Sequence, residues 1–528
     1  MKVGTAGMHS ELIQALMAPS RYAHPVDRVE LVETHISWVL LAGDYAYKIK
    51  KPVDFGFLDF SALEARAHFC AEELRLNRRH ASQLYLEVIP VTGTPAEPQL
   101  GGEGAAIEYA VRMRRFSGHD QFDRLLAAGR LQPEHIDQLA EALYDLHRQA
   151  DPAPEDSAYG LPEQVIAPMR DNFSSLRALV KDDERQAQLK RLAEWTEGRF
   201  AALCARLLER RNNDHVRECH GDAHLANVTL FQERATLFDC LEFSPDLRWT
   251  DTMADLAFTL MDLRDRGAEG LSWRLLNRYL DLSGDYAGLD LLVFYMVYRA
   301  MVRAKVAALS LADAGSEQQA AGHLDELDNY LSLALRLAGE RRPALILSFG
   351  VSASGKSWLG ERLLERCGLV RLRSDVERKR LHGLEAQART QSEPGAGLYS
   401  QAATARTYAR LAELAVDLLA AGFPVLVDAT FLKREQRAPF RRLAAGLRVP
   451  FGILACTAER AVLDARLAAR RAAGSDPSEA DARVLQRQLD LVEPCQARDG
   501  QDLLVLDTAR SDALDKASDY LERLISAR

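Results

Sequence analysis

The chain has 528 residues, a net charge of −9, 47% hydrophobic and 27% charged residues, and seven cysteines. This composition is typical of a globular protein with about two to four domains, because a single hydrophobic core does not keep growing with chain length. The acidic balance argues against non-specific nucleic-acid binding, which needs a basic surface. The cysteines are scattered without a C-x-x-C pair, which predicts reduced thiols in a cytoplasmic protein.

Neither a secretory leader nor a membrane span is expected from the pattern of apolar residues. The N-terminus lacks a basic start followed by a long apolar run. The most apolar stretch, Leu291 to Ala312, is interrupted by Arg299, Arg303 and Lys305. It therefore predicts an amphipathic helix, and no membrane partner.

The first part of the chain combines strands with a long helical region. Residues 30–60 predict a β-hairpin that turns at Gly43-Asp44. A helix follows from about Ser61 to His80, and two strands lie within 84–116 around a Gly/Pro-rich turn. The rest is mostly helical, with one non-helical island from Cys219 to Phe243; the helical stretches are 133–149, 162–211 and 249–338. A β-rich part followed by an α-rich part predicts one bilobal α+β domain.

After residues 339–343, which predict a linker, the pattern changes to apolar strands alternating with helices. The strand candidates are 344–349, 424–428, 450–456 and 503–507. This alternation is typical of a parallel α/β sheet. We therefore expect two domains, residues 1–338 and 344–528.

The non-helical island carries residues with the spacing of a kinase catalytic loop. It reads His220-Gly221-Asp222-Ala223-His224-Leu225-Ala226-Asn227, with Asp239 following in Leu237-Phe238-Asp239. Kinase chemistry uses one aspartate to orient the acceptor hydroxyl, and an asparagine and a second aspartate to hold Mg²⁺. We predict these roles for Asp222, Asn227 and Asp239, in that order.

On these motifs, residues 30–310 resemble the aminoglycoside phosphotransferase-like branch of the protein-kinase fold. That group carries H-G-D-x-H-x-x-N, and it often lacks the glycine-rich loop G-x-G-x-x-G, which is absent here. The resemblance implies that Asp255, in the Ala-Asp-Leu-Ala stretch, is a structural anchor of the catalytic loop.

The resemblance also implies a lysine that binds the ATP phosphates, on the second strand of the hairpin. Lys48 and Lys50 are two residues apart and share a face of that strand, so the sequence does not decide between them. The carboxylate partner of the lysine should lie on the following helix. Glu64, Glu72 and Glu73 are the candidates, and Glu73 is preferred.

The second domain opens with a phosphate-binding loop, Gly350-Val351-Ser352-Ala353-Ser354-Gly355-Lys356-Ser357. It matches G-x-x-x-x-G-K-[ST] and stands between an apolar strand and a helix, as the motif requires. The backbone amides and the helix N-terminus bind phosphate oxygens. Lys356 is expected to reach the β- and γ-phosphates, and the Ser357 hydroxyl to ligate Mg²⁺.

Further polar residues follow the predicted strands and the next helix. Asp375, in Ser374-Asp375-Val376-Glu377-Arg378, lies where ligands bind such sheets and can accept the proton of an acceptor hydroxyl, while Arg378 can hold an anionic group. Asp428 ends the strand in Val427-Asp428-Ala429-Thr430. Arg466 and Arg470 lie one helical turn apart, before a polar stretch from Arg471 to Ser478 that predicts a lid over the transferring phosphoryl group.

Together these items resemble a P-loop kinase group that includes polynucleotide 5′-kinases, zeta-toxin kinases and gluconate-type kinases, over residues 344–495. The resemblance implies Asp375 as general base, Arg378 as an acceptor-binding residue, Asp428 near the acceptor or Mg²⁺, and Arg470 on ATP. We expect Arg466, on the same helix face, to bind ATP as well. It does not name the acceptor.

The sequence therefore predicts a phosphotransferase with two modules, each moving the γ-phosphoryl group of Mg²⁺-bound ATP to a hydroxyl of a small molecule or nucleotide. One alternative is a toxin-like or RNA 5′-end kinase whose N-terminal module selects or regulates. Another is an interaction protein in which one module binds ATP for regulation. Neither the acceptors nor the oligomeric state follows from the sequence.

Overall fold

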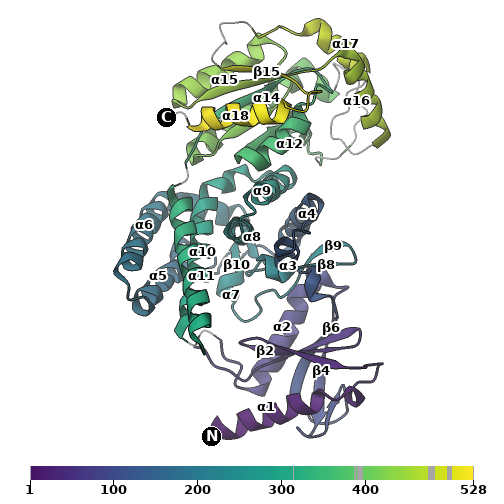
Figure 1. Cartoon of the computed structure of the whole chain (residues 1–528), viewed down its shortest axis with the longest axis vertical. Coiled ribbons are helices and arrows are strands. Elements are labelled where there is room, and N and C mark those ends of the chain that lie inside the picture. Colours follow the sequence, from purple (N-terminus) through teal and green to yellow (C-terminus); the bar gives the residue numbers. More distant parts are fainter. Residues whose placement is uncertain are drawn as a thin grey trace. The chain divides into compact units, whose positions relative to one another are not determined.

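The computed structural model describes residues 2–56, 58–312, 314–339, 341–385, 388, 397–473, 482–495 and 502–526. The described chain forms two compact units, and they do not follow chain order (Figure 1). The first unit contains residues 1–170 and 204–262, and the second contains 171–203 and 263–528. The boundary between the two modules at residues 339–343 stays a prediction.

The first unit contains a sheet of six antiparallel strands in the order β1-β2-β3-β6-β4-β5. These strands are β1 (Val29–Glu33), β2 (Ser37–Ala42), β3 (Tyr45–Lys50), β4 (Tyr85–Gly93), β5 (Pro98–Leu100) and β6 (Glu108–Arg114). Helix α1 (Lys2–Leu16) packs on one face through Leu12 and Leu16. Helix α2 (Leu63–Ala81) packs on the other through Cys70. Because side chains alternate along β3, Lys48 and Lys50 point to one face of the sheet and Tyr47 and Ile49 to the other.

The remainder of this unit carries the predicted non-helical island. Helix α4 (Pro133–Gln149) packs on the hairpin of β8 (Val228–Phe231) and β9 (Arg234–Leu237), and β7 (Val216–Glu218) pairs with β10 (Trp249–Asp251). The short helices are η1 (Pro19–Arg21), η2 (Gly118–Asp120), α3 (Phe122–Ala127), η3 (Leu225–Asn227) and α7 (Pro245–Arg248). The hairpin brings the end of the catalytic loop close to the segment with Asp239, because the backbone amide of Phe238 donates to the backbone oxygen of Asn227 at 3.0 Å.

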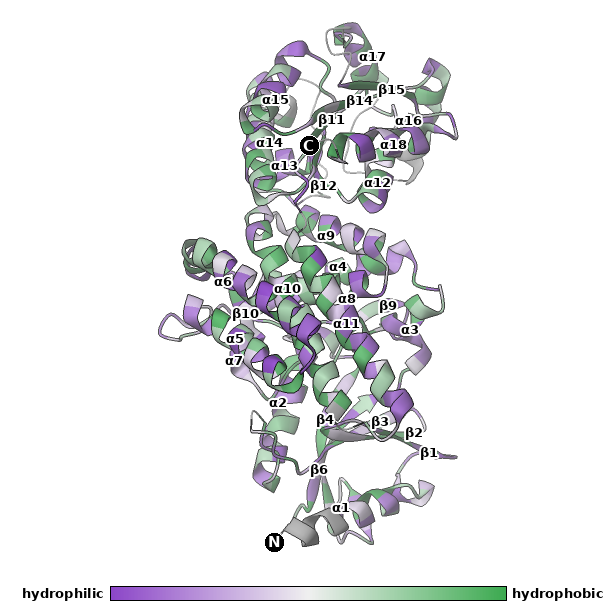
Figure 2. Cartoon of the chain, turned by 60° about the vertical axis from the view of Figure 1, so that its left-hand side comes forward, coloured by the Kyte–Doolittle hydropathy of each residue, from purple (hydrophilic) through white to green (hydrophobic). Residues whose placement is uncertain are grey.

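Three helices contribute residues to both units: α5 (Pro162–Leu179), α6 (Asp183–Asn212) and α8 (Thr252–Asp265). The second unit continues with α9 (Glu269–Ser283), η4 (Tyr286–Gly288), α10 (Leu289–Ala312) and α11 (Glu317–Gly339), of which α10 and α11 pack along each other. No helix among the described residues is both long and apolar enough to cross a bilayer. In Figure 2 hydrophobic and hydrophilic residues both occur along α10 and α11.

The second unit also contains five parallel strands in the order β12-β13-β11-β14-β15. The strands are β11 (Leu345–Phe349), β12 (Val370–Arg373), β13 (Val425–Asp428), β14 (Phe451–Thr457) and β15 (Leu503–Asp507). The helices around them are α12 (Lys356–Cys367), α13 (Ser374–Arg380), η5 (Gly397–Tyr399), α14 (Gln401–Ala421), α15 (Arg434–Leu447), α16 (Arg460–Ala473), α17 (Ala482–Leu491) and α18 (Ala513–Ser526). Parallel strands covered on both faces are apolar throughout, which explains why four of them were predicted.

Helix α1 and strands β1 and β12 are among the elements that were not predicted from the sequence. In the part of the chain that the structure describes, β1 lies at the sheet edge and pairs with β2. Strand β12 has arginines at two of its four positions, so it does not give the apolar run of a buried strand. Its arginines are paired by residues far away in the chain, described below.

Candidate functional site

The predicted catalytic loop is held in shape by its own residues. The Asn227 Nδ2 atom donates to the backbone oxygen and to the Oδ2 atom of Asp222, at 3.0 Å each. Gly221 has a φ of +83° and lies close to Leu241 and Arg248, so a side chain there would meet both a strained backbone and crowding. The Asp222 carboxylate is therefore fixed by Asn227 and remains partly exposed.

Asp255 holds the catalytic loop in place through hydrogen bonds, as the resemblance implied. Its carboxylate accepts hydrogen bonds from the backbone amides of His220 at 3.0 Å and Gly221 at 2.9 Å. The ring of His147 lies 3.1 Å from its Oδ2 atom. Asp255 is fully buried, so these donors compensate a charge that would otherwise be costly to bury. The structural role expected for Asp255 is confirmed.

The structure distinguishes the two lysines of β3 by their partners. The Lys48 Nζ atom lies 2.8 Å from Glu73 Oε1 and also donates to the carboxylate of Asp239. Asp239 has a left-handed backbone with φ +63°, a strained conformation of the kind found at functional sites. Lys48 therefore connects the helix glutamate to the second predicted Mg²⁺ ligand.

Lys50 is fully buried and has a different second partner. Its Nζ atom lies 2.7 Å from Glu73 Oε2 and also donates to Glu242. Burial acts to raise the pKa of Glu73, but the two ammonium groups outweigh it and lower that pKa to about 2. Burial and the charge of Glu73 raise the pKa of Glu242, against the opposing charge of Lys50. Lys50 donates to both of these glutamates. Glu242 was not predicted as a site residue, although it follows Asp239 by only three residues.

Helix α2 is fixed to the catalytic loop region by further polar contacts. Glu218 receives hydrogen bonds from Arg75 at 2.7 Å, Arg79 at 3.1 Å and Arg248 at 3.0 Å. The Asn77 Oδ1 atom accepts a hydrogen bond from the backbone amide of Cys240 at 3.1 Å. Because α2 carries Glu73, these contacts also position the ion pair with Lys48.

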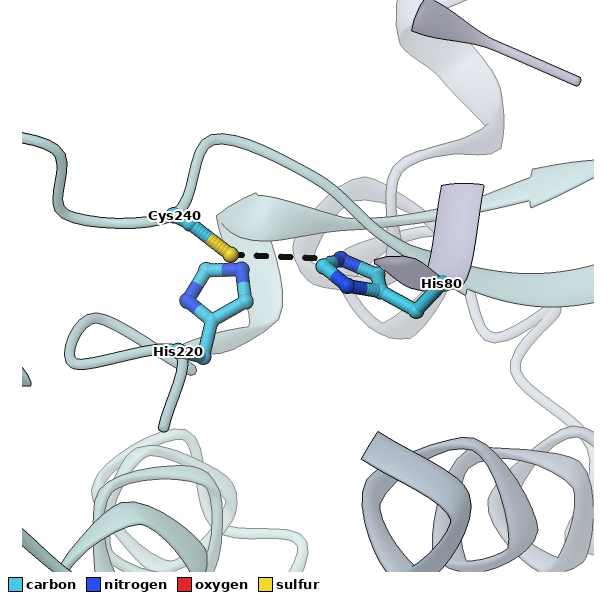
Figure 3. Close-up of side chains that lie close together, drawn as sticks. All are labelled: His80, His220 and Cys240. Carbon is cyan, nitrogen blue, oxygen red and sulfur yellow. Dashed lines mark hydrogen bonds between the residues drawn. The ribbon is translucent and has the colours of Figure 1, made fainter. Parts of the chain in front are cut away.

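Two histidines and a cysteine, His80, His220 and Cys240, lie close together (Figure 3), and Cys240 directly follows Asp239 in the chain. The His80 Nε2 atom is 3.9 Å from Cys240 Sγ, and the His220 Nε2 atom is 3.0 Å from the backbone oxygen of Phe238. Burial raises the pKa of the Cys240 thiol, which disfavours the thiolate that metals bind. The three side chains bring α2, the catalytic loop and the segment after β9 together.

The catalytic loop and the segment after β9 carry oxygen donors suited to Mg²⁺, and a backbone hydrogen bond from Phe238 to Asn227 at 3.0 Å joins the two segments. Asp222, Asn227 and Asp239 supply carboxylate and amide oxygens, which are the ligands that Mg²⁺ takes. Asp239 keeps about 40% of its side chain exposed despite its contact with Lys48. The donor set therefore fits a Mg²⁺ ion bound together with nucleotide phosphates.

The phosphate-binding loop of the second unit is shaped so that only glycine fits at its ends. A Cβ atom on Gly350 would lie 2.4 Å from the backbone oxygen of Cys456, and one on Gly355 would lie 2.7 Å from Thr508 Oγ1. The Ser354 hydroxyl is buried and has no hydrogen-bond partner among the described residues. A buried donor in a loop of this shape fits a phosphate oxygen.

Other residues of the loop contact side chains from α16, α17 and the end of β15. The Ser352 amide donates to Gln488 Oε1 at 2.6 Å, and the Lys356 Nζ atom donates to the backbone oxygen of Val351 at 2.8 Å. Ser357 is exposed at the start of α12. Gln488 was not predicted, because nothing in the sequence connects α17 to the loop.

Arg466 was predicted to bind ATP and lies beside the loop. Its Nη1 atom donates to Thr508 Oγ1 at 2.8 Å, and Thr508 in turn donates to the backbone oxygen of Ser354 at 2.7 Å. Thr508, which follows strand β15, was missed. Arg470 lies in α16, but its side chain lies outside the described residues. The predicted lid, Arg471 to Ser478, begins inside α16, which continues to Ala473, and the rest of it lies outside the described residues.

The predicted acceptor residues lie at the carboxyl ends of β12 and β13. Arg378 Nη1 lies 3.4 Å from Asp375 Oδ1 within the first turns of α13. Asp428 is buried, and the Ser348 hydroxyl lies 3.3 Å from its Oδ1 atom. In the register of the parallel pair, Asp428 stands beside Arg373, the residue before Ser374. Asp375 and Asp428 therefore lie at the carboxyl ends of the parallel strands, which is where ligands of such folds bind.

Comparison with known proteins identifies the two modules. Residues 61–292 match the family model described as "Phosphotransferase enzyme family", and residues 345–495 match the one described as "AAA domain". These matches confirm the predicted fold class, a kinase-like phosphotransferase fold followed by a parallel-sheet P-loop domain. Two kinase-like modules indicate phosphotransferase activity.

Two mycobacterial relatives span nearly the whole chain. "Uncharacterized protein Rv2004c" of Mycobacterium tuberculosis (strain ATCC 25618 / H37Rv) is 31% identical over 479 residues, covering 89% of this chain and 92% of the relative. "Uncharacterized protein Mb2027c" of Mycobacterium bovis gives the same values. Both modules are therefore present in one chain in these relatives too.

Solved structures resemble each module separately. A gluconokinase from Sinorhizobium meliloti 1021 is 26% identical, covering 35% of this chain and 95% of its own, with a TM-score of 0.25. A choline/ethanolamine kinase family protein from Mesorhizobium loti is 17% identical, covering 62% and 99%, with a TM-score of 0.38. These TM-scores are low, so the family models define the modules.

Proposed function

The chain belongs to the same family as the mycobacterial protein Rv2004c, and on this premise we propose that it is an ATP-dependent kinase with two phosphotransfer sites. Each site transfers the γ-phosphoryl group of ATP to a hydroxyl of a small-molecule or nucleotide acceptor. Residues 1–338 carry the first site and residues 344–528 the second, joined by 339–343. The observation that carries the proposal is the contact of Lys48 with both Glu73 and Asp239.

In the first site, Lys48 is placed by Glu73 to neutralise ATP phosphates, and Asp222 is placed by Asn227 to accept the proton of the acceptor hydroxyl. Asn227 and Asp239 would hold Mg²⁺, which supplies positive charge to the phosphate oxygens when bound. Lys50, buried between Glu73 and Glu242, keeps the lysine–glutamate pair in position.

In the second site, the loop from Gly350 to Ser357 cradles the phosphates through its amides, the Ser354 hydroxyl and Lys356. Ser357 and Asp428 are the candidates to hold Mg²⁺ there. Asp375 takes the acceptor proton, and Arg378, 3.4 Å from it, binds an anionic group of the acceptor. Arg466 supports the nucleotide side of the loop through Thr508.

The test uses isosteric changes in the full chain, with γ-labelled ATP and a panel of sugars, nucleosides and 5′-hydroxyl RNA. Asp222→Asn and Asp375→Asn should each lower turnover of a different acceptor by about 10² or more, since each removes a proton acceptor. Asp156→Asn and Asp417→Asn change exposed carboxylates outside both sites and serve as controls.

The outcomes separate the competing functions. Turnover that survives the double variant Asp222→Asn/Asp375→Asn would contradict phosphotransfer at these sites. A labelled RNA 5′ end that depends on Asp375 would identify the second site as an RNA-end kinase. ATP binding without transfer to any acceptor, in wild type and variants alike, would favour a regulatory ATP-binding protein.

A further inference from the structure

Strand β12 is the last strand on one side of the parallel sheet, and helix α9 packs against it. The Asn277 Nδ2 atom donates to the backbone oxygen of Leu369 at 2.8 Å, and its Oδ1 atom accepts from the backbone amide of Arg371 at 2.7 Å. One side-chain amide thus satisfies two backbone groups that a further strand would otherwise pair. Covering an edge in this way also prevents pairing with another chain.

Neighbouring residues of α9 seat it against α12 and the strand. Trp273 leaves no room for a side chain at Gly368, where a Cβ atom would lie 2.7 Å from the indole nitrogen. Arg274 forms ion pairs with Glu365 at 2.7 Å and Glu361 at 3.4 Å. Helix α9 falls within residues 61–292, which match the phosphotransferase family model. The first module therefore supplies a helix that packs against the sheet of the second.

The last turn of α9 brings Asp281 to the two arginines of β12. Asp281 Oδ2 lies 3.3 Å from Arg373 Nη1 and 3.8 Å from Arg371 Nη2. All three residues have little exposed surface, so the charges are poorly screened. Arg371 also donates to the backbone oxygen of Ser357 at 3.4 Å.

Arg373 forms an ion pair with Asp281 and has a carboxylate of the P-loop site as its neighbour on the adjacent strand. Its register partner on β13 is Asp428. Although burial acts to lower the pKa of Arg373, the charges of Asp281, Asp428 and Asp375 raise it, and Asp281 has the largest effect of the three. Among the described residues, the ion pair that Arg373 forms is with Asp281.

We propose that Asp281 is a positioning residue of the P-loop site: it holds the Arg373 guanidinium so that Asp428 remains available to Mg²⁺ and ATP. This inference rests on the proposed function of the second site. Without the Asp281 charge, the nearest carboxylate on the neighbouring strand is Asp428, and Arg373 would pair with it. The phosphotransferase module would thereby set the metal requirement of the P-loop module.

The test measures the Mg²⁺ concentration that half-saturates binding of a fluorescent ATP analogue, in the full chain. An Asp239→Asn background removes the first site, and the signal that is lost on Lys356→Ala is assigned to the second. Asp281→Asn should raise the half-saturating Mg²⁺ about tenfold, as expected for loss of a residue that supports a metal ligand. Asp281→Glu keeps the charge and should give a smaller rise.

The distinctive expectation is rescue by removing the arginine. In Asp281→Asn/Arg373→Met there is no guanidinium to capture Asp428, so the Mg²⁺ dependence should return close to that of the wild type. Glu269→Gln, an exposed change at the start of the same helix, should leave it unaltered. Thermal unfolding of each variant shows whether it folds, and Asp281→Glu replaces Asp281→Asn as the test if the latter does not.

A wild-type Mg²⁺ dependence in Asp281→Asn, or a double variant as defective as the single one, would overturn the positioning role and leave the proposed function standing. Wild-type protein without any Lys356-dependent binding would instead overturn the proposed function of the second site, and this inference with it.

Discussion

Lys48 and Glu73, which are 25 residues apart in the chain, meet in a buried ion pair with 2.8 Å between Nζ and Oε1. The second oxygen of Glu73 is held by Lys50 at 2.7 Å. One carboxylate therefore orders two ammonium groups, of which Lys48 faces Asp239 and Lys50 faces Glu242. This division of partners gives the two lysines different expected roles.

Replacing the two lysines should separate catalysis from stability. Lys48→Met should remove most Asp222-dependent turnover while Lys50 still compensates Glu73. Lys50→Met should lower the free energy of unfolding by about 3–5 kcal/mol, because it removes the lysine that compensates the buried carboxylate of Glu242. Steady-state kinetics and urea unfolding of both variants provide the measurement. Equal loss of stability in the two variants would show that the lysines are not divided in this way.

A side chain at Gly350 should block the phosphate-binding loop. In Gly350→Ala the new Cβ atom would lie 2.4 Å from a backbone oxygen and 2.6 Å from Ser354 Oγ, where the backbone cannot easily yield. We expect loss of Lys356-dependent nucleotide binding, measured by calorimetry. Gly446→Ala, in helix α15 with open space around it, is the matched control and should gain about 0.5–1 kcal/mol of stability. Nucleotide binding unchanged in Gly350→Ala would refute the predicted loop shape.

Removing the Thr508 hydroxyl should weaken the hydrogen bonding that holds the phosphate-binding loop in place. Thr508→Val keeps the side-chain shape but removes the hydrogen bond to Ser354 and the acceptor for Arg466. Loss of a buried hydrogen bond costs about 1–3 kcal/mol, so nucleotide affinity should fall by about fivefold or more. Thr457→Val, which changes an exposed threonine on the neighbouring strand, is the comparison. If both variants bind nucleotide equally well, Thr508 has no part in the site.

Folding stability should fall as the pH drops below the ordinary pKa of histidine. Burial, His220 and Arg79 lower the pKa of His80 well below its ordinary value of 6.5, against the opposing charge of Asp255. Below pH 6.5 the unfolded chain therefore binds a proton that the folded chain does not, and the stability present above that pH is progressively lost.

The measurement is urea unfolding between about pH 5 and pH 8, where one such proton contributes at most about 1.4 kcal/mol per pH unit. His80→Gln should reduce the slope of the free energy of unfolding against pH. His119→Gln, an exposed histidine, should leave the slope as it is in the wild type. Identical slopes in all three proteins would mean that His80 is readily protonated in the folded state.

The sequence by itself determined what is local. The catalytic loop and the phosphate-binding loop each place their reacting groups within eight consecutive residues, so spacing alone predicts Asp222 with Asn227, and Gly350 with Lys356. The alternation of apolar strands and helices after residue 343 predicted the parallel sheet, because both faces of such a sheet are buried. Asp255 was expected as the anchor from the resemblance of its motif.

Only the tertiary structure decided which distant groups meet. Lys48 and Lys50 share one face of β3, and periodicity carries no information about which carboxylate stands opposite each of them. Glu242, Thr508 and Asp281 gain their partners through contacts between elements far apart in the chain. A residue's own neighbours fix its face and its exposure, whereas its partner is fixed by the packing of the whole fold.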